Sequence, residues 1–119
     1  MFFRRCCYRA CFCNRSMDRF DITMEQLKQM QAQGAIICDI RSPQEYNEGH
    51  LQGAILLPEY DIYKMANRLL PNKEQVIVVY CDTGARSYTS LRKLQRLGYQ
   101  HVYNLYKGTD NYWCETSVN

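Results

Sequence analysis

Two apolar runs constrain the fold of this chain more than any other feature. Residues 35–40 read AIICDI and residues 76–81 read VIVVYC, and neither run alternates polar with apolar residues. Continuous apolar runs of this length are typical of strands that are buried on both faces, as in a parallel sheet covered by helices. Both runs are far shorter than the roughly 20 residues that a membrane-spanning helix needs. The chain is therefore predicted to form an α/β domain, and no membrane association is expected.

The segments around these runs carry helix signals. Thr23 and Gln26 have the spacing of a capping box, and Gly34 supplies a stop for the helix that they begin. The predicted strands are residues 20–22, 35–40, 54–58, 76–81 and 101–105. The predicted helices are residues 24–33, residues 61–70, a segment that ends at Gly98 and a short final helix from residue 108. Because strands and helices alternate, a parallel sheet covered on both faces is expected.

The size and charge of the chain limit its class. A chain of 119 residues is large enough for one domain and too small for two. The net charge is +3, but residues 1–17 hold four arginines and no acid, which leaves 11 basic against 12 acidic groups in the rest. A nearly neutral body does not favour nucleic-acid binding. We predict a Cys- and Arg-rich leader at residues 1–17 and a folded domain at residues 18–119.

The cysteines are unevenly placed along the chain. Four of the seven lie in the leader, and the body has only Cys38, Cys81 and Cys114. A sparse, odd set in an α/β pattern is typical of a reducing compartment, so a cytoplasmic location is predicted. The leader is expected to be disordered and dispensable for activity. Its cysteine spacing matches no standard metal motif, and acylation of its paired cysteines is an alternative without a second signal.

Cys81 has the sequence context of a reactive cysteine. It ends the most apolar strand, and the loop CDTGARS at residues 81–87 leads directly into a helix. Parallel sheets bind their ligands at the carboxyl ends of their strands. A lone cysteine on a buried strand is more often a packing residue. The combination of a strand end, the Gly84 turn, Arg86 and an immediate helix favours a nucleophile instead.

Ionisation of this cysteine requires several contributions. A free thiol has a pKa of about 8.5, so about 3% of it is thiolate at pH 7. Making about three-quarters of it thiolate takes roughly 2.7 kcal/mol, whereas a helix N-terminus supplies about 0.3–1 kcal/mol, or about 2 in sheltered geometry. The rest is expected from Arg86 and from backbone N–H groups of the loop, which Gly84 allows to turn tightly. Asp82 would oppose ionisation, so its side chain is expected to point to solvent.

Three linked motifs resemble the rhodanese family of sulfurtransferase domains. The loop CDTGARS is similar to the active-site segment of that family, and DIRSPQEYNEGHLQGAILLP at residues 39–58 resembles its strand-and-loop signature. The segment GTDNYW at residues 108–113 is close to its closing motif. The resemblance covers residues 20–113 in the expected order.

The resemblance implies a rhodanese-like α/β fold, with a five-stranded parallel sheet flanked by helices on both faces. It implies that Cys81 takes a sulfane sulfur from thiosulfate or a persulfide donor and passes it to a thiol- or cyanide-type acceptor. Arg86 would orient the loop and meet an anionic donor. The other loop residues would bind the outer sulfur through their amides: Asp82, Thr83, Gly84, Ala85 and Ser87. No cofactor or metal is expected, the partners are a small-molecule donor and a thiol or protein acceptor, and a monomer is expected.

Two residues depart from the family pattern. Thr109 stands where a second glycine is common, which bears on the local shape of the closing loop. Asp82 occupies a position where thiosulfate-using members often carry a basic residue. This departure favours a protein persulfide or a low-molecular-weight persulfide over thiosulfate as the donor.

Several other residues are assigned structural roles. Asp39 and Arg41 are predicted to pin the loop after their strand through hydrogen bonds. His50 is predicted to fix a loop and not to act as a base. Cys38 is predicted to be an inert core residue, and Trp113 to anchor the core or a lid.

The sequence leaves the roles of three further residues open. Tyr80 and Tyr88 flank the loop, where they line a rim for the acceptor or serve only in packing. Cys114 could resolve a persulfide on Cys81 as a disulfide, although the sequence does not establish the distance between them.

Two other functions are compatible with this sequence. A cell-cycle-type phosphatase or arsenate reductase also uses a cysteine and an arginine, but with five residues between them where this chain has four. A shorter loop makes a smaller ring of amides, which suits one sulfur atom better than a phosphoryl group. The second alternative is a non-enzymatic module that carries sulfur or binds a partner.

Overall fold

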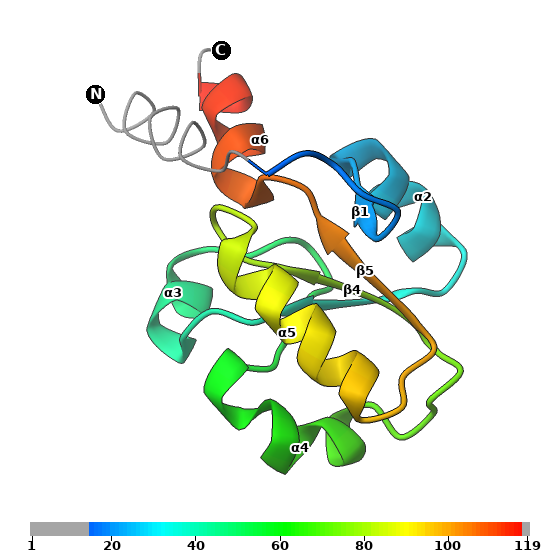
Figure 1. Ribbon diagram of the computed structural model, residues 1–119. Helices are drawn as coiled ribbons and strands as arrows, with labels where there is room; N and C mark the ends of the chain where they lie inside the picture. Colours follow the sequence, from blue (N-terminus) through cyan, green and yellow to red (C-terminus); the bar gives the residue numbers. More distant parts are fainter. Residues whose placement is uncertain (1–14, 118–119) are drawn as a thin grey trace.

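A computed structural model of the chain describes residues 15–117, with side chains described from residue 15 to residue 112. It contains one five-stranded sheet in which every pairing is parallel, as predicted (Figure 1). The strands are β1 (Asp21–Ile22), β2 (Ile36–Asp39), β3 (Ile55–Leu56), β4 (Val76–Tyr80) and β5 (His101–Leu105). Their order across the sheet is β1-β5-β4-β2-β3. The most apolar strand, β4, is therefore central and pairs with β5 on one edge and with β2 on the other.

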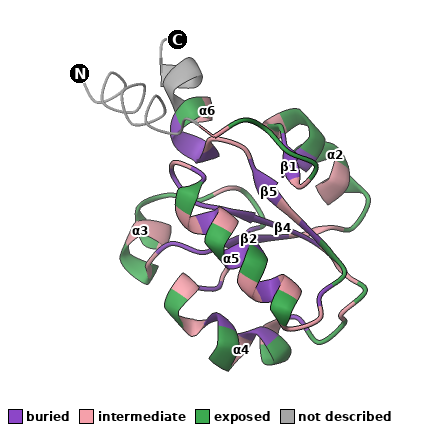
Figure 2. Ribbon diagram, viewed as in Figure 1, coloured by how far each residue is buried: buried purple, intermediate pink, exposed green. Residues whose placement is uncertain are grey.

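Helices cover both faces of the sheet. They are α2 (Met24–Ala32), α3 (Pro43–Glu48), α4 (Ile62–Leu69), α5 (Ala85–Arg96) and α6 (Gly108–Ser117), with a 3₁₀ helix η1 (Glu59–Asp61) before α4. Residues alternate along β4: Ile77 and Val79 pack in a core with α4 and α5, and Val78 and Tyr80 pack in a second core with α2. Figure 2 shows this central strand buried along most of its length. The predicted two-faced α/β architecture is confirmed.

Local sequence signals explain where the first helices begin. The Thr23 hydroxyl accepts from the Gln26 amide, and the Gln26 side chain accepts from the Thr23 amide, so the predicted capping box is present. A second capping box, between Ser42 and Glu45, begins α3 with Pro43 in its first turn. The segment between β2 and β3 therefore contains a short, capped helix.

Some predicted elements differ in length from those observed. The predicted third strand, residues 54–58, is reduced to the two residues of β3, which lies at the edge of the sheet and pairs only with β2. The final helix, predicted to be short, extends to Ser117. Within the described residues, no helix is long and apolar enough to cross a membrane.

Most of the predicted leader lies outside the described residues, which begin at Arg15. The Arg15 guanidinium is bonded to the Asp21 carboxylate, with 2.8 Å between Nη2 and Oδ1, and lies 4.0 Å from the centre of the Tyr88 ring. The Tyr106 hydroxyl also donates to the Arg15 carbonyl. Arg15 is thus joined to β1, α5 and the segment after β5.

Candidate active site around Cys81

Cys81 lies at the carboxyl end of the central strand, directly after β4. Its carbonyl accepts from the Thr109 amide at 3.0 Å, and the Thr109 hydroxyl lies 3.4 Å from the same oxygen. Thr109 therefore fits the closing loop in place of a glycine and ties the start of α6 to the end of β4. Cys81 itself is fully buried, with 0% of its surface exposed.

The Cys81 sulfur is held by two backbone N–H groups of the following loop. The Gly84 amide nitrogen lies 3.1 Å from Sγ and the Ser87 amide nitrogen lies 3.3 Å from it. Donors aimed at a sulfur favour its negatively charged form. The structure thus brings two of the predicted amides to the sulfur. A third contact comes from the Ser87 hydroxyl, whose oxygen is 3.4 Å from Sγ.

Two glycines allow this loop to close on the segment that begins α6. Gly84 has φ +92°, and a Cβ there would lie 3.0 Å from the Lys107 backbone nitrogen. Gly108 has φ +66°, and a Cβ there would overlap the Asp82 carbonyl. Both positions need a residue without a side chain, because the left-handed conformation and the close backbone contact each disfavour a Cβ. The amide of Gly84 is aimed at the sulfur as a result.

Arg86, beside the loop, forms ion pairs with two carboxylates. Its guanidinium binds both Glu45 oxygens, at 3.2 and 3.0 Å, and one Asp82 oxygen at 3.2 Å. The hydrogen bond with Glu45 raises the pKa of Arg86, against the opposing effect of burial, and Asp82 raises it further. The same bond, with help from the Ser42 amide and against burial, lowers the pKa of Glu45 to about 2. Arg86 is therefore a cation held between two carboxylates.

The prediction that Asp82 points to solvent is wrong. Asp82 is 8% exposed, because its carboxylate turns back to bind Arg86 one helical turn later. The expectation overlooked that an acid four residues before an arginine is well placed to pair with it across the first turn of a helix. The contribution of Arg86 to binding an anionic donor remains a prediction.

Sequence reasoning missed Glu45. It carries two roles, since it caps α3 through Ser42 and binds Arg86 on α5. The Ser42–Glu45 spacing signals the cap, but no local pattern indicates a partner 41 residues away.

A buried hydrogen-bond chain behind Cys81 was also missed. The Ser87 hydroxyl is bonded to the Asn104 side-chain oxygen, and the Asn104 amide nitrogen lies 3.0 Å from Asp21 Oδ1. Asp21 in turn binds Arg15. The exposed fractions of Ser87 and Asn104 are 0%, and that of Asp21 is 6%. We call Ser87, Asn104 and Asp21 the buried relay.

The loop after β2 is pinned as predicted. Asp39 accepts from the Arg41 amide at 2.9 Å and from the Arg41 guanidinium at 2.7 Å, and Arg41 also donates to the Gly49 carbonyl. His50 is exposed, lies stacked on Tyr46 with 3.7 Å between ring centres, and its Nδ1 is 2.8 Å from the Tyr46 carbonyl oxygen. These contacts agree with the predicted structural roles of Asp39, Arg41 and His50.

The two tyrosines beside the loop differ in their surroundings. Tyr80 is 0% exposed and its hydroxyl donates to Asp39, so it packs in the core and cannot line a rim. Tyr88 is half-buried, and its hydroxyl donates to Asp18 at 2.5 Å. Cys38 is buried at 0% exposure, and burial raises its pKa to about 12, which agrees with an inert core thiol. The side chains of Trp113 and Cys114 lie outside the described residues.

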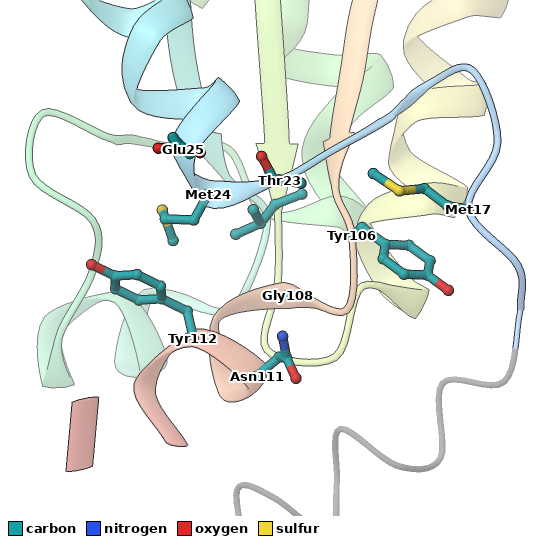
Figure 3. Close-up of a pocket in the computed structure, with 9 residues that line it drawn as sticks. Met17, Thr23, Met24, Glu25, Tyr106, Gly108, Asn111 and Tyr112 are labelled. Carbon is teal, nitrogen blue, oxygen red and sulfur yellow. The ribbon is translucent and has the colours of Figure 1, made fainter. Parts of the chain in front are cut away.

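A pocket of about 310 Å³ lies on the α2 side of the same sheet edge. Its lining includes Met17, Met24, Tyr106, Gly108 and Tyr112, and Cys81 is not part of it (Figure 3). The methionine and tyrosine side chains surround the space between the start of α2 and the start of α6. In the described part of the chain, no cluster of His, Cys, Asp and Glu side chains could hold a metal ion.

Comparison with known proteins gives the family. Residues 23–115 match the family described as the rhodanese-like domain. The chain belongs to this family. The matched range contains Cys81, Gly84, Gly108 and the signature at residues 39–58.

Individual relatives differ in how much of their length they share with this rhodanese-like domain. "Thiosulfate sulfurtransferase PspE" of Escherichia coli is 35% identical over 66 residues, which cover 56% of this chain and 64% of PspE. "Putative sulfur carrier protein YrkF" of Bacillus subtilis is 30% identical over 98 residues, which cover 81% of this chain and 52% of YrkF. The chain thus spans less than two thirds of the length of either relative.

A solved structure supports the fold. The human single-domain sulfurtransferase TSTD1 superimposes with a TM-score of 0.68 at 24% identity, covering 82% of this chain and 97% of TSTD1. At this identity the likeness concerns the fold alone.

Proposed function

We propose that this rhodanese-like domain is a sulfurtransferase that carries a sulfane sulfur on Cys81. The observation that supports the proposal most directly is the pair of backbone N–H groups, from Gly84 and Ser87, aimed at the Cys81 sulfur at the end of β4. A sulfur in such a nest of donors can bear negative charge, first as the thiolate and then as the outer sulfur of a persulfide.

The reaction consists of two displacements at sulfur. In the first, the Cys81 thiolate attacks the sulfane sulfur of the donor, a new S–S bond forms on Cys81, and the bond to the rest of the donor breaks. Sulfite leaves if the donor is thiosulfate, and a thiolate leaves if it is a persulfide. In the second, cyanide or an acceptor thiolate attacks the outer sulfur, and the Cys81 thiolate leaves with its electron pair.

The charges around Arg86 support a persulfide donor over thiosulfate. Arg86 already binds Glu45 and Asp82, so this group of three side chains carries one net negative charge. A thiosulfate dianion would have to compete with two carboxylates for the guanidinium. A persulfide carries at most one negative charge at its reacting end, and it would meet less repulsion.

The burial of Cys81 bears on how a donor reaches it. Because Cys81 is 0% exposed, the first displacement requires the groups that cover its sulfur to move aside. Ala85 and Arg86 form the start of α5 directly after the loop, with Ala85 exposed and Arg86 partly exposed. We propose that the donor enters between this loop and α3.

A second candidate is a sulfur carrier that loads Cys81 but turns over slowly. The similarity to YrkF, whose name describes a putative sulfur carrier protein, favours this alternative. Both functions need the same loaded Cys81, and they differ in the rate of the second displacement.

A turnover assay tests the proposal. The protein is mixed with glutathione persulfide or thiosulfate, cyanide is added, and thiocyanate is measured over many turnovers, with Cys81→Ser as the control. We expect steady thiocyanate formation from the unchanged protein alone, faster with the persulfide. One equivalent of thiocyanate per protein would indicate the carrier. Release of phosphate from an aryl phosphate, without thiocyanate, would indicate a phosphatase instead.

A further inference from the structure

The buried relay ends on the Cys81 sulfur, and its hydrogen bonds have a fixed direction. Asp21 binds the Arg15 guanidinium, and hydrogen bonds from Arg15 and Asn104 lower the pKa of the Asp21 carboxyl even though its burial acts in the opposite direction. Asp21 is therefore an ionised carboxylate at neutral pH. An ionised carboxylate can only accept hydrogen bonds.

This property of Asp21 determines how the Asn104 amide is oriented. The Asn104 group that faces Asp21 Oδ1, at 3.0 Å, must be the NH₂ group, because two acceptors would repel each other. The Asn104 carbonyl oxygen must then face Ser87, as observed. Asp21 thus excludes the flipped form of the Asn104 amide. Without this contact the two forms would be hard to tell apart, because the oxygen and the NH₂ group have nearly the same shape.

The orientation of Asn104 in turn uses the only proton of the Ser87 hydroxyl. Because the Asn104 oxygen is an acceptor, the Ser87 O–H must donate to it. The Ser87 oxygen then presents lone pairs to Cys81 Sγ, 3.4 Å away, and can only accept the proton of the thiol. The sulfur therefore has two amide donors that favour the thiolate and one oxygen that favours the thiol.

We propose that Asn104 and Asp21 are positioning residues that keep the Ser87 hydroxyl turned away from the Cys81 sulfur, so that this hydroxyl opposes ionisation of the resting cysteine. The inference rests on the proposed role of Cys81 as the nucleophile. After Cys81 loses its proton, Asn104 still holds the Ser87 hydroxyl, so only the two amides stabilise the thiolate. The relay thus opposes ionisation at rest and leaves the two amides to support the charged sulfur during transfer.

Other charged groups surround this sulfur and act in all variants alike. They are Asp82 on the loop, Arg86 on α5, Glu45 on α3, Asp21 on β1, Lys107 between β5 and α6, and Asp110 on α6; Cys38 on β2 is titratable but stays a neutral thiol near pH 7. The test therefore changes only Ser87 and Asn104, which are uncharged at any pH, and compares the variants with one another.

The first test is the variant Ser87→Ala. Iodoacetamide alkylation is followed at the Cys81 peptide by mass spectrometry from pH 5 to pH 10, and the midpoint of the rate curve is compared with that of the unchanged protein. The relay predicts that the midpoint falls by about half a pH unit, because the thiol loses its acceptor while both amides remain. If Ser87 instead donates to the thiolate, the midpoint rises. A rise, or no change, overturns the proposal.

Ser90→Ala is the matched control. Ser90 is equally buried on the same helix, but its hydroxyl donates to the Arg86 carbonyl and does not contact the sulfur. Its midpoint is expected to stay where it is in the unchanged protein. An equal shift in both variants would mean that the effect reflects packing on α5, which also contradicts the relay.

The second test is a double-mutant cycle with Asn104→Leu. Removing the Asn104 oxygen frees the Ser87 hydroxyl to donate to the sulfur, so the midpoint is expected to fall by about half a unit to one unit. In the Ser87→Ala background the same substitution should leave the midpoint unchanged. A shift of equal size in both backgrounds overturns the proposal, and a folding defect in Asn104→Leu leaves the sign of the Ser87→Ala shift as the deciding result.

These tests do not depend on sulfur transfer. The alkylation midpoint reports the proton on Cys81 whether or not the protein accepts a sulfur. If the midpoints behave as predicted but the turnover assay fails, the relay is correct and the proposed function is wrong. If turnover is present but Ser87→Ala raises the midpoint, the proposed function holds and the relay is wrong.

Discussion

At the scale of single residues, the site depends on two features. Backbone segments pack closely against each other beside Cys81, and the charges of neighbouring side chains offset one another. Gly84 places its amide on the Cys81 sulfur only because it has no Cβ to meet Lys107. Arg86 supplies a positive charge, but Glu45 and Asp82 offset it before any substrate arrives. Each feature leads to a prediction about one substitution.

Gly84→Ala is expected to reduce both stability and sulfur transfer. The new Cβ would lie 3.0 Å from the Lys107 nitrogen at φ +92°, so the loop must shift and carry its amide away from the sulfur. Strain of this kind costs about 1–3 kcal/mol, which urea unfolding measures alongside the thiocyanate assay. Gly34→Ala is the matched control, because Gly34 has φ +104° with open space around it. It should lose stability through strain and keep its transfer rate, whereas equal loss of transfer in both would contradict this account.

Glu45→Gln is expected to change which donor is used. Glutamine can still accept from the Ser42 amide, but it no longer neutralises Arg86. The KM for thiosulfate should fall by up to about five-fold at low salt, the range of a partly exposed ion pair, and the KM for glutathione persulfide should change less. Glu48→Gln, an exposed position on the same helix, is the control and should leave both values unchanged. A KM for thiosulfate that does not change in Glu45→Gln would show that the carboxylate does not limit donor binding.

At the scale of elements, the site is the meeting point of one strand end, two loops and two helices. The sequence predicted the strand, the turn and the helix at residues 76–97, because the apolar run, the Gly84 turn and the stop at Gly98 are local signals. It also predicted the amides of Gly84 and Ser87 as donors to the sulfur. It could not predict Glu45, Asn104 or Asp21, since these residues reach the site from α3, β5 and β1 through tertiary packing.

The pairing of α3 with α5 predicts a specific loss of stability in acid. The pKa of Glu45 is about 2 in the folded protein, against an ordinary value near 4.5, because Arg86 binds its carboxylate. A lowered folded-state pKa contributes stability that is fully present above about pH 4.5 and is lost as the pH falls toward 2. Urea unfolding at pH 7, 4.5 and 3 should therefore show a difference between the unchanged protein and Glu45→Gln that shrinks with falling pH. A difference that stays constant would mean that the ion pair does not stabilise the fold.

At the scale of the whole molecule, the alternation of apolar runs with helix signals was enough to predict a five-stranded parallel sheet with helices on both faces. The strand order β1-β5-β4-β2-β3 depends on which strands pair across the sheet, and local patterns do not specify it. Residue 18 was predicted as the start of the domain from composition. The composition of residues 1–17 gave no sign that Arg15 would bind the buried Asp21.

Two truncations test the role of this N-terminal part. Removing residues 1–14 is expected to leave the free energy of unfolding unchanged, whereas removing residues 1–17 should lower it by about 1.5–3 kcal/mol, because the buried Asp21 loses a charged partner. Both forms are expected to keep sulfur transfer. Urea unfolding and the thiocyanate assay measure the two effects, and a large loss of transfer in either form would place this segment in the active site.

The most direct measurement of the central claim is the intact mass of the protein after incubation with glutathione persulfide. The account predicts that the mass increases by one sulfur atom, that cyanide removes this sulfur, and that Cys81→Ser gains none. A protein that gains no sulfur, or a Cys81→Ser variant that gains as much as the unchanged protein, would contradict it.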